Sequence, residues 1–355
     1  MKRIMLAASA LALIGAAPAK EPPPIANYWM DVSTASGMGA GMTPGMSPDQ
    51  IMQMMQGGSG VSHTLNLYLA SREKAAAPEA QHIIPPGLQM GPSLPLLAPA
   101  AAKPAPAPAM PQNFQRPQGK MLIYWGCGEH AGPGQPVTVD FSKMAAGQMP
   151  PGFAAMVQAA QPPRPGQSPG FGEWPNERDS RPVPGTGSLL GAHKVEGNYS
   201  PPIAFSLSAG QDFMPGLGLR EAGTLPSGAI RLAWTPAAQA TGYALSMFGA
   251  NPGGEVLVWT SASKAAAFPM LDYLSPAQVK KLVAAGGALP PSASECTVPA
   301  EVIRASPAGM VMMIGYGPEA FFSDKPKAPT WTVRARYKTT ASLMLGMAGM
   351  MGGGN

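Results

Sequence analysis

Short runs in which apolar and polar residues alternate constrain the fold of this chain more than any other feature. In VSHTLNLYL, residues 61–69, Leu65, Leu67 and Leu69 alternate with polar residues, and WTVRARYKT, residues 331–339, follows the same rule. A period of two places every second side chain on one face, which is typical of a half-buried β-strand. The pattern predicts a protein built mainly from strands.

Helices are expected to be few. One has Ser275 as N-cap, Pro276 at its first position and Gly286 as its terminator. A second helix is predicted at 47–57, which has the same start and stop signals. Further strands are predicted at 27–35, 121–127, 136–141, 202–208, 228–235, 242–249, 255–261, 297–304 and 309–316.

Glycine and proline, 43 residues each, concentrate between these strands and suggest how the chain is divided. A Pro/Ala-rich tract at about 98–118 is expected to form a loop, and the Pro/Gly-rich stretch 150–186 is expected to be a linker. We therefore predict a mainly β protein with two sandwich-like domains, long loops and a few short helices. The predicted parts are the N-terminal β domain 20–149, the second β domain 187–343 and a Met/Gly-rich tail 344–355.

The first residues are typical of a secretory signal peptide. Lys2 and Arg3 precede an apolar run, and the triplet Ala17-Pro18-Ala19 resembles a cleavage site. The predicted signal is 1–19, so the mature chain would begin at Lys20. No later apolar stretch reaches the ~18–20 residues that span a bilayer. The expected location is the periplasm or the extracellular space.

The charge balance argues against nucleic acid as a partner. The net charge is +5, and without Lys2 and Arg3 it is +3, from 22 basic and 19 acidic residues. The basic residues are scattered, so they form no electrostatic footprint for a polyanion.

The two cysteines, Cys127 and Cys296, have two interpretations. An even pair in an oxidising compartment is expected to form a disulfide. Such a bond would close a very long loop and tie the two halves of the chain together. The alternative is that Cys127 is a metal ligand.

The segment 227–262 resembles strands B, C and C-prime of a fibronectin type III domain. The resemblance lies in Leu232 and Trp234 before a proline, in Tyr243 early in the next strand, and in a Gly-rich turn. It implies a two-sheet sandwich over about 200–343 in which Trp234 fills the core. Domains of this family mostly mediate contacts.

The segment YWGCGEHAGPGQPVTVDF, residues 124–141, resembles the copper-ligand loop of a cupredoxin. Cys127 and His130 would supply a thiolate and an imidazole, Gln135 would be the axial ligand, and His82 would be the second imidazole. The resemblance implies a copper-binding or electron-transfer protein. The interpretation without metal places Cys127 in a disulfide and His130 on the surface.

Methionine is concentrated near both ends of the chain. The residues concerned are Met38, Met42, Met46, Met344, Met347, Met350 and Met351. Thioethers are suited to Cu(I), but methionine is also an adaptable packing residue. We favour packing.

Conventional catalysis has little support in the sequence. The chain has four histidines and lacks the nucleophile-elbow, zinc-helix and phosphate-loop motifs. We expect a non-enzymatic envelope protein that binds an unidentified protein or envelope component through strand edges, through aromatic loops such as Phe171 and Trp174, or through the Met-rich termini. The alternatives are the copper protein and a hydrolase with an unrecognised active site.

Overall fold

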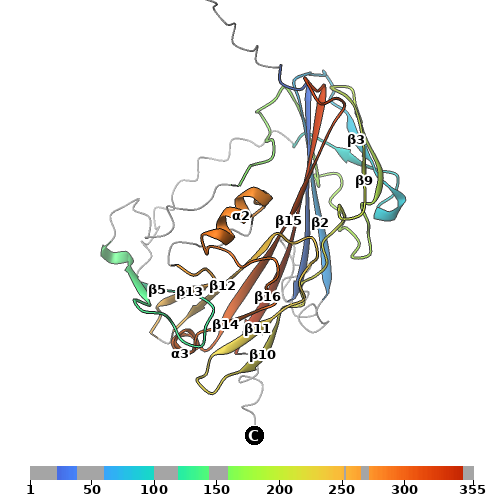
Figure 1. Ribbon diagram of the computed structural model, residues 1–355. Coiled ribbons are helices and arrows are strands. Elements are labelled where there is room, and N and C mark those ends of the chain that lie inside the picture. The colour runs from blue at the N-terminus through green and yellow to red at the C-terminus, as the bar shows by residue number, and fades with distance from the viewer. Residues whose placement is uncertain are drawn as a thin grey trace, which may run out of the picture.

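The protein is mainly β, with one large mixed sheet and two small antiparallel sheets (Figure 1). The computed structural model describes residues 22–37, 60–99, 119–143, 159–251, 253–264 and 272–346. No helix within these ranges has the length and apolar character needed to cross a bilayer.

The large sheet has nine strands, most of them antiparallel to their neighbours. Two neighbouring pairs are parallel, β1 with β16 and β13 with β5. From one edge to the other, the order is β6 (Val137–Asp140), β5 (Lys120–Trp125), β13 (Val256–Thr260), β12 (Gly242–Ala250), β15 (Gly309–Ser323), β16 (Trp331–Leu345), β1 (Ala26–Gly37), β2 (Val61–Ser71) and β7 (Gly170–Trp174).

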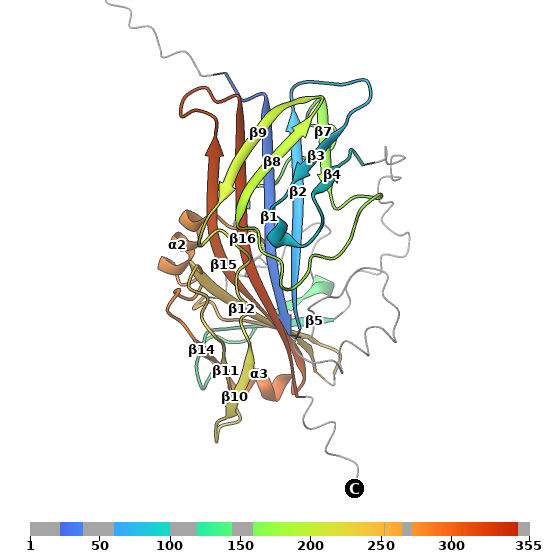
Figure 2. The same ribbon diagram turned by 90° about the vertical axis from the view of Figure 1, so that its right-hand side faces the viewer.

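The two small sheets lie near opposite ends of the large sheet (Figure 2). The four-stranded sheet has the order β4 (Ser93–Leu96), β3 (Ala80–Ile83), β8 (Gly191–Gly197) and β9 (Ser200–Leu207). The three-stranded sheet has the order β10 (Arg220–Thr224), β11 (Ile230–Ala233) and β14 (Glu295–Val298). The helices are α2 (Pro276–Ala284) and α3 (Ala300–Ala305), with 3-10 turns η1 (Pro86–Leu88) and η2 (Phe141–Lys143).

One face of the large sheet, here the inner face, forms the main core. The alternation predicted for β2 and β16 is confirmed, because Leu65, Leu67 and Leu69 are buried there and pack in the same cluster as Val333. On β9, Phe205 of the four-stranded sheet contacts this face through the Tyr28 ring. At the other end Trp234 lies 5.6 Å from the Tyr243 ring, centroid to centroid.

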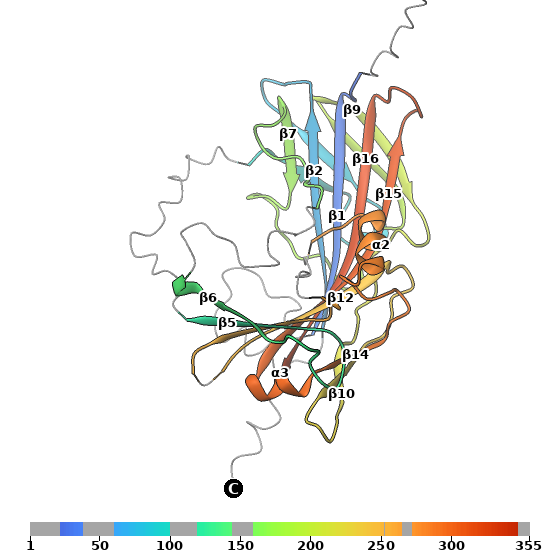
Figure 3. The same cartoon turned by 60° about the vertical axis from the view of Figure 1, so that its left-hand side comes forward.

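The opposite or outer face is covered in part by α2. Val279 of this helix packs with Ile314 and Tyr316 of β15, and Figure 3 shows the helix in front of that strand. The predicted helix start is confirmed, because the Ser275 side chain accepts a hydrogen bond from the Gln278 backbone in a full capping box. Gly286 ends it with φ +73°, a conformation that favours glycine.

Strands from both sides of residue 186 form the large sheet. β1, β2, β5, β6 and β7 precede this residue, and β12, β13, β15 and β16 follow it. The predicted boundary therefore does not separate one sheet from another. The boundary fails because β1 and β16, the first and last described strands, pair with each other inside this sheet.

Several local predictions require correction. The strand predicted at 297–304 is the short β14 followed by α3, since a helix begins after Pro299. The stretch predicted as a linker contains β7, in which Phe171 and Trp174 are 6% and 2% exposed, so neither is an exposed loop residue. The signal 1–19, the helix 47–57, most of 98–118 and all the methionines named above except Met344 lie outside the described residues.

Candidate functional site

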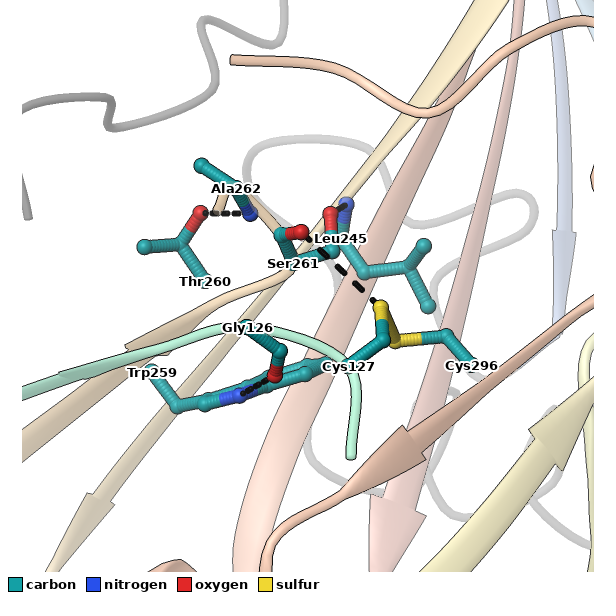
Figure 4. The surroundings of a disulfide bond; sticks show 8 residues. All are labelled: Gly126, Cys127, Leu245, Trp259, Thr260, Ser261, Ala262 and Cys296. Carbon is teal, nitrogen blue, oxygen red and sulfur yellow. Dashed lines mark hydrogen bonds between the residues drawn. A yellow bond between two sulfur atoms is a disulfide. The ribbon is translucent and has the colours of Figure 1, made fainter. Parts of the chain in front are cut away.

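Cys127 and Cys296 form a disulfide, as predicted for an even pair of cysteines (Figure 4). Their sulfur atoms are 2.05 Å apart, and 169 residues separate them in the chain. The bond joins the loop after β5, the second strand from one edge of the large sheet, to β14 in the three-stranded sheet. Cys127 is exposed, whereas Cys296 is 3% exposed.

Hydrogen bonds hold the Cys127 loop independently of the disulfide. The Gly126 carbonyl accepts from Trp259 Nε1 at 2.9 Å, and Gly128 N donates to the Thr297 carbonyl at 3.0 Å. Figure 4 shows the Ser261 carbonyl oxygen facing Cys127 Sγ, 3.8 Å away. A disulfide sulfur carries no hydrogen, so this last approach is a contact rather than a hydrogen bond.

The other residues of the predicted copper site have separate partners. His130 is exposed and pairs with Glu301 at 3.1 Å. The Ala131 backbone N–H, followed by weaker contributions including His130, lowers the pKa of Glu301 to about 2. Gln135 Oε1 accepts from the backbone N–H of Trp125 at 2.8 Å.

The structure therefore does not bring His82 together with Cys127, His130 and Gln135 as one ligand set. Cys127 has no thiolate to offer, because its sulfur is bonded to Cys296. His82 lies on β3, at the other end of the molecule from β5 in both Figures 1 and 2, and bonds to Tyr28 and His193. Within the described ranges, no three His, Cys, Asp or Glu side chains form a group that could hold a metal ion.

The outer face carries an arrangement that sequence analysis did not identify. Strand register aligns five side chains in one line across β7, β2, β1, β16 and β15, and we name them the aromatic row. They are Glu173, Tyr68, Trp29, Arg334 and Phe321. Directly opposed residues on neighbouring strands share a face. At ~4.8 Å between strands, the row is about 19 Å long.

A cation–aromatic ladder crosses this row and continues along β16. The guanidinium carbon of Arg334 lies 4.7 Å from the Trp29 ring and 5.3 Å from the Phe321 ring. Arg336 lies 4.9 Å from Trp29 and 4.6 Å from Tyr273, and Lys338 Nζ lies 4.3 Å from Tyr273. Such contacts contribute ~0.5–2 kcal/mol each, more when they exclude water.

Two ion pairs fix the arginines of the ladder. Arg336, which is 2% exposed, makes a bidentate pair with Asp31 at 2.7 and 2.5 Å and donates to the Ala160 carbonyl. Burial raises the pKa of the Asp31 carboxyl, and the guanidinium opposes that rise. Arg334 pairs with Glu319 at 2.6 Å. Neither guanidinium can reorient without breaking a charge-assisted pair.

The aromatic row is more accessible than the ion pairs beside it. Phe321 is 65% exposed, and Trp29, Tyr68, Arg334 and Glu173 are partly exposed. Burial raises the pKa of Glu173, and among the described residues no cation pairs with this carboxylate. The row therefore combines aromatic rings with one carboxylate that no described cation pairs with.

A separate concavity of about 800 Å³ lies on the side of the four-stranded sheet away from the core. Its lining includes Glu79, Gln81, Arg178, Glu196 and Asn198. These side chains offer hydrogen-bond donors and acceptors, and the lining contains no aromatic ring on which a ligand could stack. The aromatic row has the stronger recognition chemistry, because aromatic and arginine side chains dominate binding hot spots.

Removing the disulfide is expected to lower stability without displacing the loop. In Cys127→Ser/Cys296→Ala, the unfolded chain regains the entropy of a very long loop, worth up to about 5 kcal/mol. Chemical denaturation measures the loss, and the tryptophan bands of the near-ultraviolet circular dichroism should match those of the unaltered protein, because Gly126 and Gly128 remain hydrogen-bonded. A lost near-ultraviolet spectrum in the double variant would contradict this account of the loop.

The contribution of the Asp31–Arg336 pair to stability can also be tested. Arg336→Met leaves a buried carboxylate unpaired and is expected to cost about 3–5 kcal/mol in the free energy of unfolding. Asp31→Leu/Arg336→Met removes both charges and should recover most of that loss. Urea denaturation measures the free energy of unfolding of the single and double variants. If the double variant is less stable than Arg336→Met, the pair is not the dominant interaction at this place.

Comparisons with protein-family models, with curated proteins and with solved structures found no match. The disulfide and the chemistry of the outer face are therefore the observations that bear on function.

Proposed function

We propose that this chain is an exported, non-enzymatic protein of the cell envelope that binds a protein partner through the aromatic row. The Cys127–Cys296 disulfide supports export, because such bonds persist in oxidising compartments. The signal-like residues 1–19 support the same location, periplasmic or extracellular.

The proposed architecture is two sandwich-like units that share one large sheet. The four-stranded sheet and the three-stranded sheet would each cover one end of its inner face. The packing of Trp234 on Tyr243 supports the resemblance to fibronectin type III over about 200–343, since a buried tryptophan between two sheets is expected there. The parallel pairing of β13 with β5 is a departure, because β5 precedes that segment.

The composition and exposure of the aromatic row carry the functional proposal. Trp29, Tyr68 and Arg334 are residue types that supply most of the energy at protein interfaces, and Phe321 adds an exposed ring beside them. The ladder holds Trp29, Arg334 and Phe321 in place before a partner arrives, so little entropy is lost on binding.

The charges of the row indicate what the partner presents. Arg334 and Arg336 are neutralised by Glu319 and Asp31, whereas Glu173 has no described cationic partner. The partner is therefore proposed to be a protein segment with a lysine or arginine that pairs with Glu173 and lies near the Tyr68 ring.

The export proposal predicts a processed, fully oxidised protein. We expect the mature N-terminus at Lys20 and no free thiol in the denatured, unreduced protein isolated from the envelope fraction. N-terminal sequencing and thiol labelling measure the two properties. An intact N-terminus with two free thiols in the cytosolic fraction would refute export.

The binding proposal is tested by photo-cross-linking in the native host. A benzophenone side chain at position 321 should give one discrete adduct with a protein partner, identified by mass spectrometry. The same probe at Phe248, which is 45% exposed on β12, is the matched control and should not give that adduct.

The charge of Glu173 provides the decisive comparison. Glu173→Lys in the position-321 probe protein should reduce the adduct at least ten-fold, because it places a like charge against the partner's cation. An adduct of equal yield from position 248, or one unaffected by Glu173→Lys, would contradict the row as the contact surface.

A further inference from the structure

Three buried side chains form a hydrogen-bonded chain between the large sheet and the four-stranded sheet. Tyr28 on β1 bonds to His82 Nδ1 at 2.9 Å, and His82 Nε2 bonds to His193 Nδ1 at 2.9 Å. His193 Nε2 then bonds to the Leu189 carbonyl at 2.6 Å. His82 is on β3 and His193 on β8, and they are 0% and 2% exposed.

The Leu189 carbonyl determines where every hydrogen in this chain lies. A carbonyl only accepts, so His193 Nε2 must carry a hydrogen, and the neutral ring then has a lone pair at Nδ1. His82 Nε2 must therefore donate to His193 and His82 Nδ1 must accept, which requires the Tyr28 hydroxyl to donate. All three groups are satisfied in this single arrangement only when both imidazoles are neutral.

Protonation has no comparable arrangement. With both rings charged, His82 Nε2–H and His193 Nδ1–H would point at each other across 2.9 Å. With only one ring charged, on either histidine, His82 Nδ1 carries a hydrogen, so Tyr28 must accept from it and its own hydrogen leaves this chain. Either state also places a charge in the core, where no solvent compensates it.

Among the described residues around the pair, only the Leu189 carbonyl favours a charge, on His193, and burial outweighs it. Phe205 of β9 stacks on both imidazoles and contacts Phe322 of β15. Tyr199 acts electrostatically on Tyr28, but neither is an anion near neutral pH, because burial raises both phenol pKa values. Asp212 follows β9, and its carboxylate is bonded to the Ser188 hydroxyl and the Leu189 N–H.

We propose that the Tyr28–His82–His193 chain is an acid-sensitive fastener that holds the four-stranded sheet on the large sheet only while both imidazoles are neutral. Acidification releases β3, β8 and β9, whereas the end of the molecule tied by the Cys127–Cys296 disulfide stays closed. The fastener is independent of the proposed binding function.

The sign and size of the effect follow from proton linkage. Burial lowers the pKa of both histidines in the closed protein. The open form, with ordinary values near 6.5, therefore takes up protons first, and its population grows as pH falls below about 6.5. Where both rings stay neutral in the closed form, two such imidazoles raise the opening constant about 100-fold between pH 7.5 and 5.5.

Hydrogen exchange of the wild-type protein tests the proposal without any substitution. After correction for intrinsic rates, protection of β3, β8 and β9 should fall about 100-fold between pH 7.5 and 5.5, and that of β12 and β13 far less. An equal fall in both regions, or no fall in the first, would overturn the fastener.

Two variants distinguish the effect of this histidine pair from that of His63. His193→Gln keeps an acceptor and a donor but removes one titrating ring, so the fall should shrink to about ten-fold. His63, whose ring stacks on Phe213 at 3.9 Å and whose pKa burial also lowers, is the control. His63→Gln should keep the 100-fold response of β3 and β8, and its loss in that variant would assign the effect to His63 instead.

Discussion

Parallel pairing of β1 with β16 is the interaction on which the rest of the structure depends. It runs without interruption from Ala26 opposite Trp331 to Gly37 opposite Ser342. The alternation of both strands places Tyr28 and Val333 on the inner face and Trp29 and Arg334 on the outer face. A shift of one residue would exchange the two faces, so the core and the ladder depend on the same register.

The inner and outer faces place different demands on the same pair of strands. On the inner face, Tyr28 is both a core ring and the donor that begins the histidine chain. On the outer face, Asp31 meets Arg336 at its register position and orients the guanidinium between two aromatic rings. A buried polar network specifies one arrangement when every member is satisfied. The Tyr28–His82–His193 chain and the Asp31–Arg336 pair both meet this condition in their main contacts.

Sequence reasoning predicted the strands better than their partners. The alternation located β1, β2 and β16, and the Ser275 cap located α2, because these signals are local. The short strands β3, β4 and β8 were missed, since runs of four to seven residues give no clear period. The disulfide was predicted from the oxidising compartment and the even number of cysteines.

The aromatic row and the copper site show why sites were harder to predict. Cys127, His130 and Gln135 are close in sequence, yet their partners are Cys296, Glu301 and the Trp125 backbone. Conversely, Trp29 and Arg334 belong to opposite ends of the described chain but are direct register neighbours. The polar positions of 331–339 were visible in the sequence, but strand order was needed to place aromatic rings between them.

The register of β1 against β16 can be measured directly by engineered cross-linking. Asn27 and Thr332 face each other, and their side chains are 2.8 Å apart, so Asn27→Cys/Thr332→Cys should oxidise rapidly to a disulfide. Asn27→Cys/Thr340→Cys places the second thiol opposite position 35, at the other end of the strand, and should remain reduced under the same conditions. Preferential cross-linking of 27 to 340 would contradict the parallel pairing and, with it, the placement of both faces.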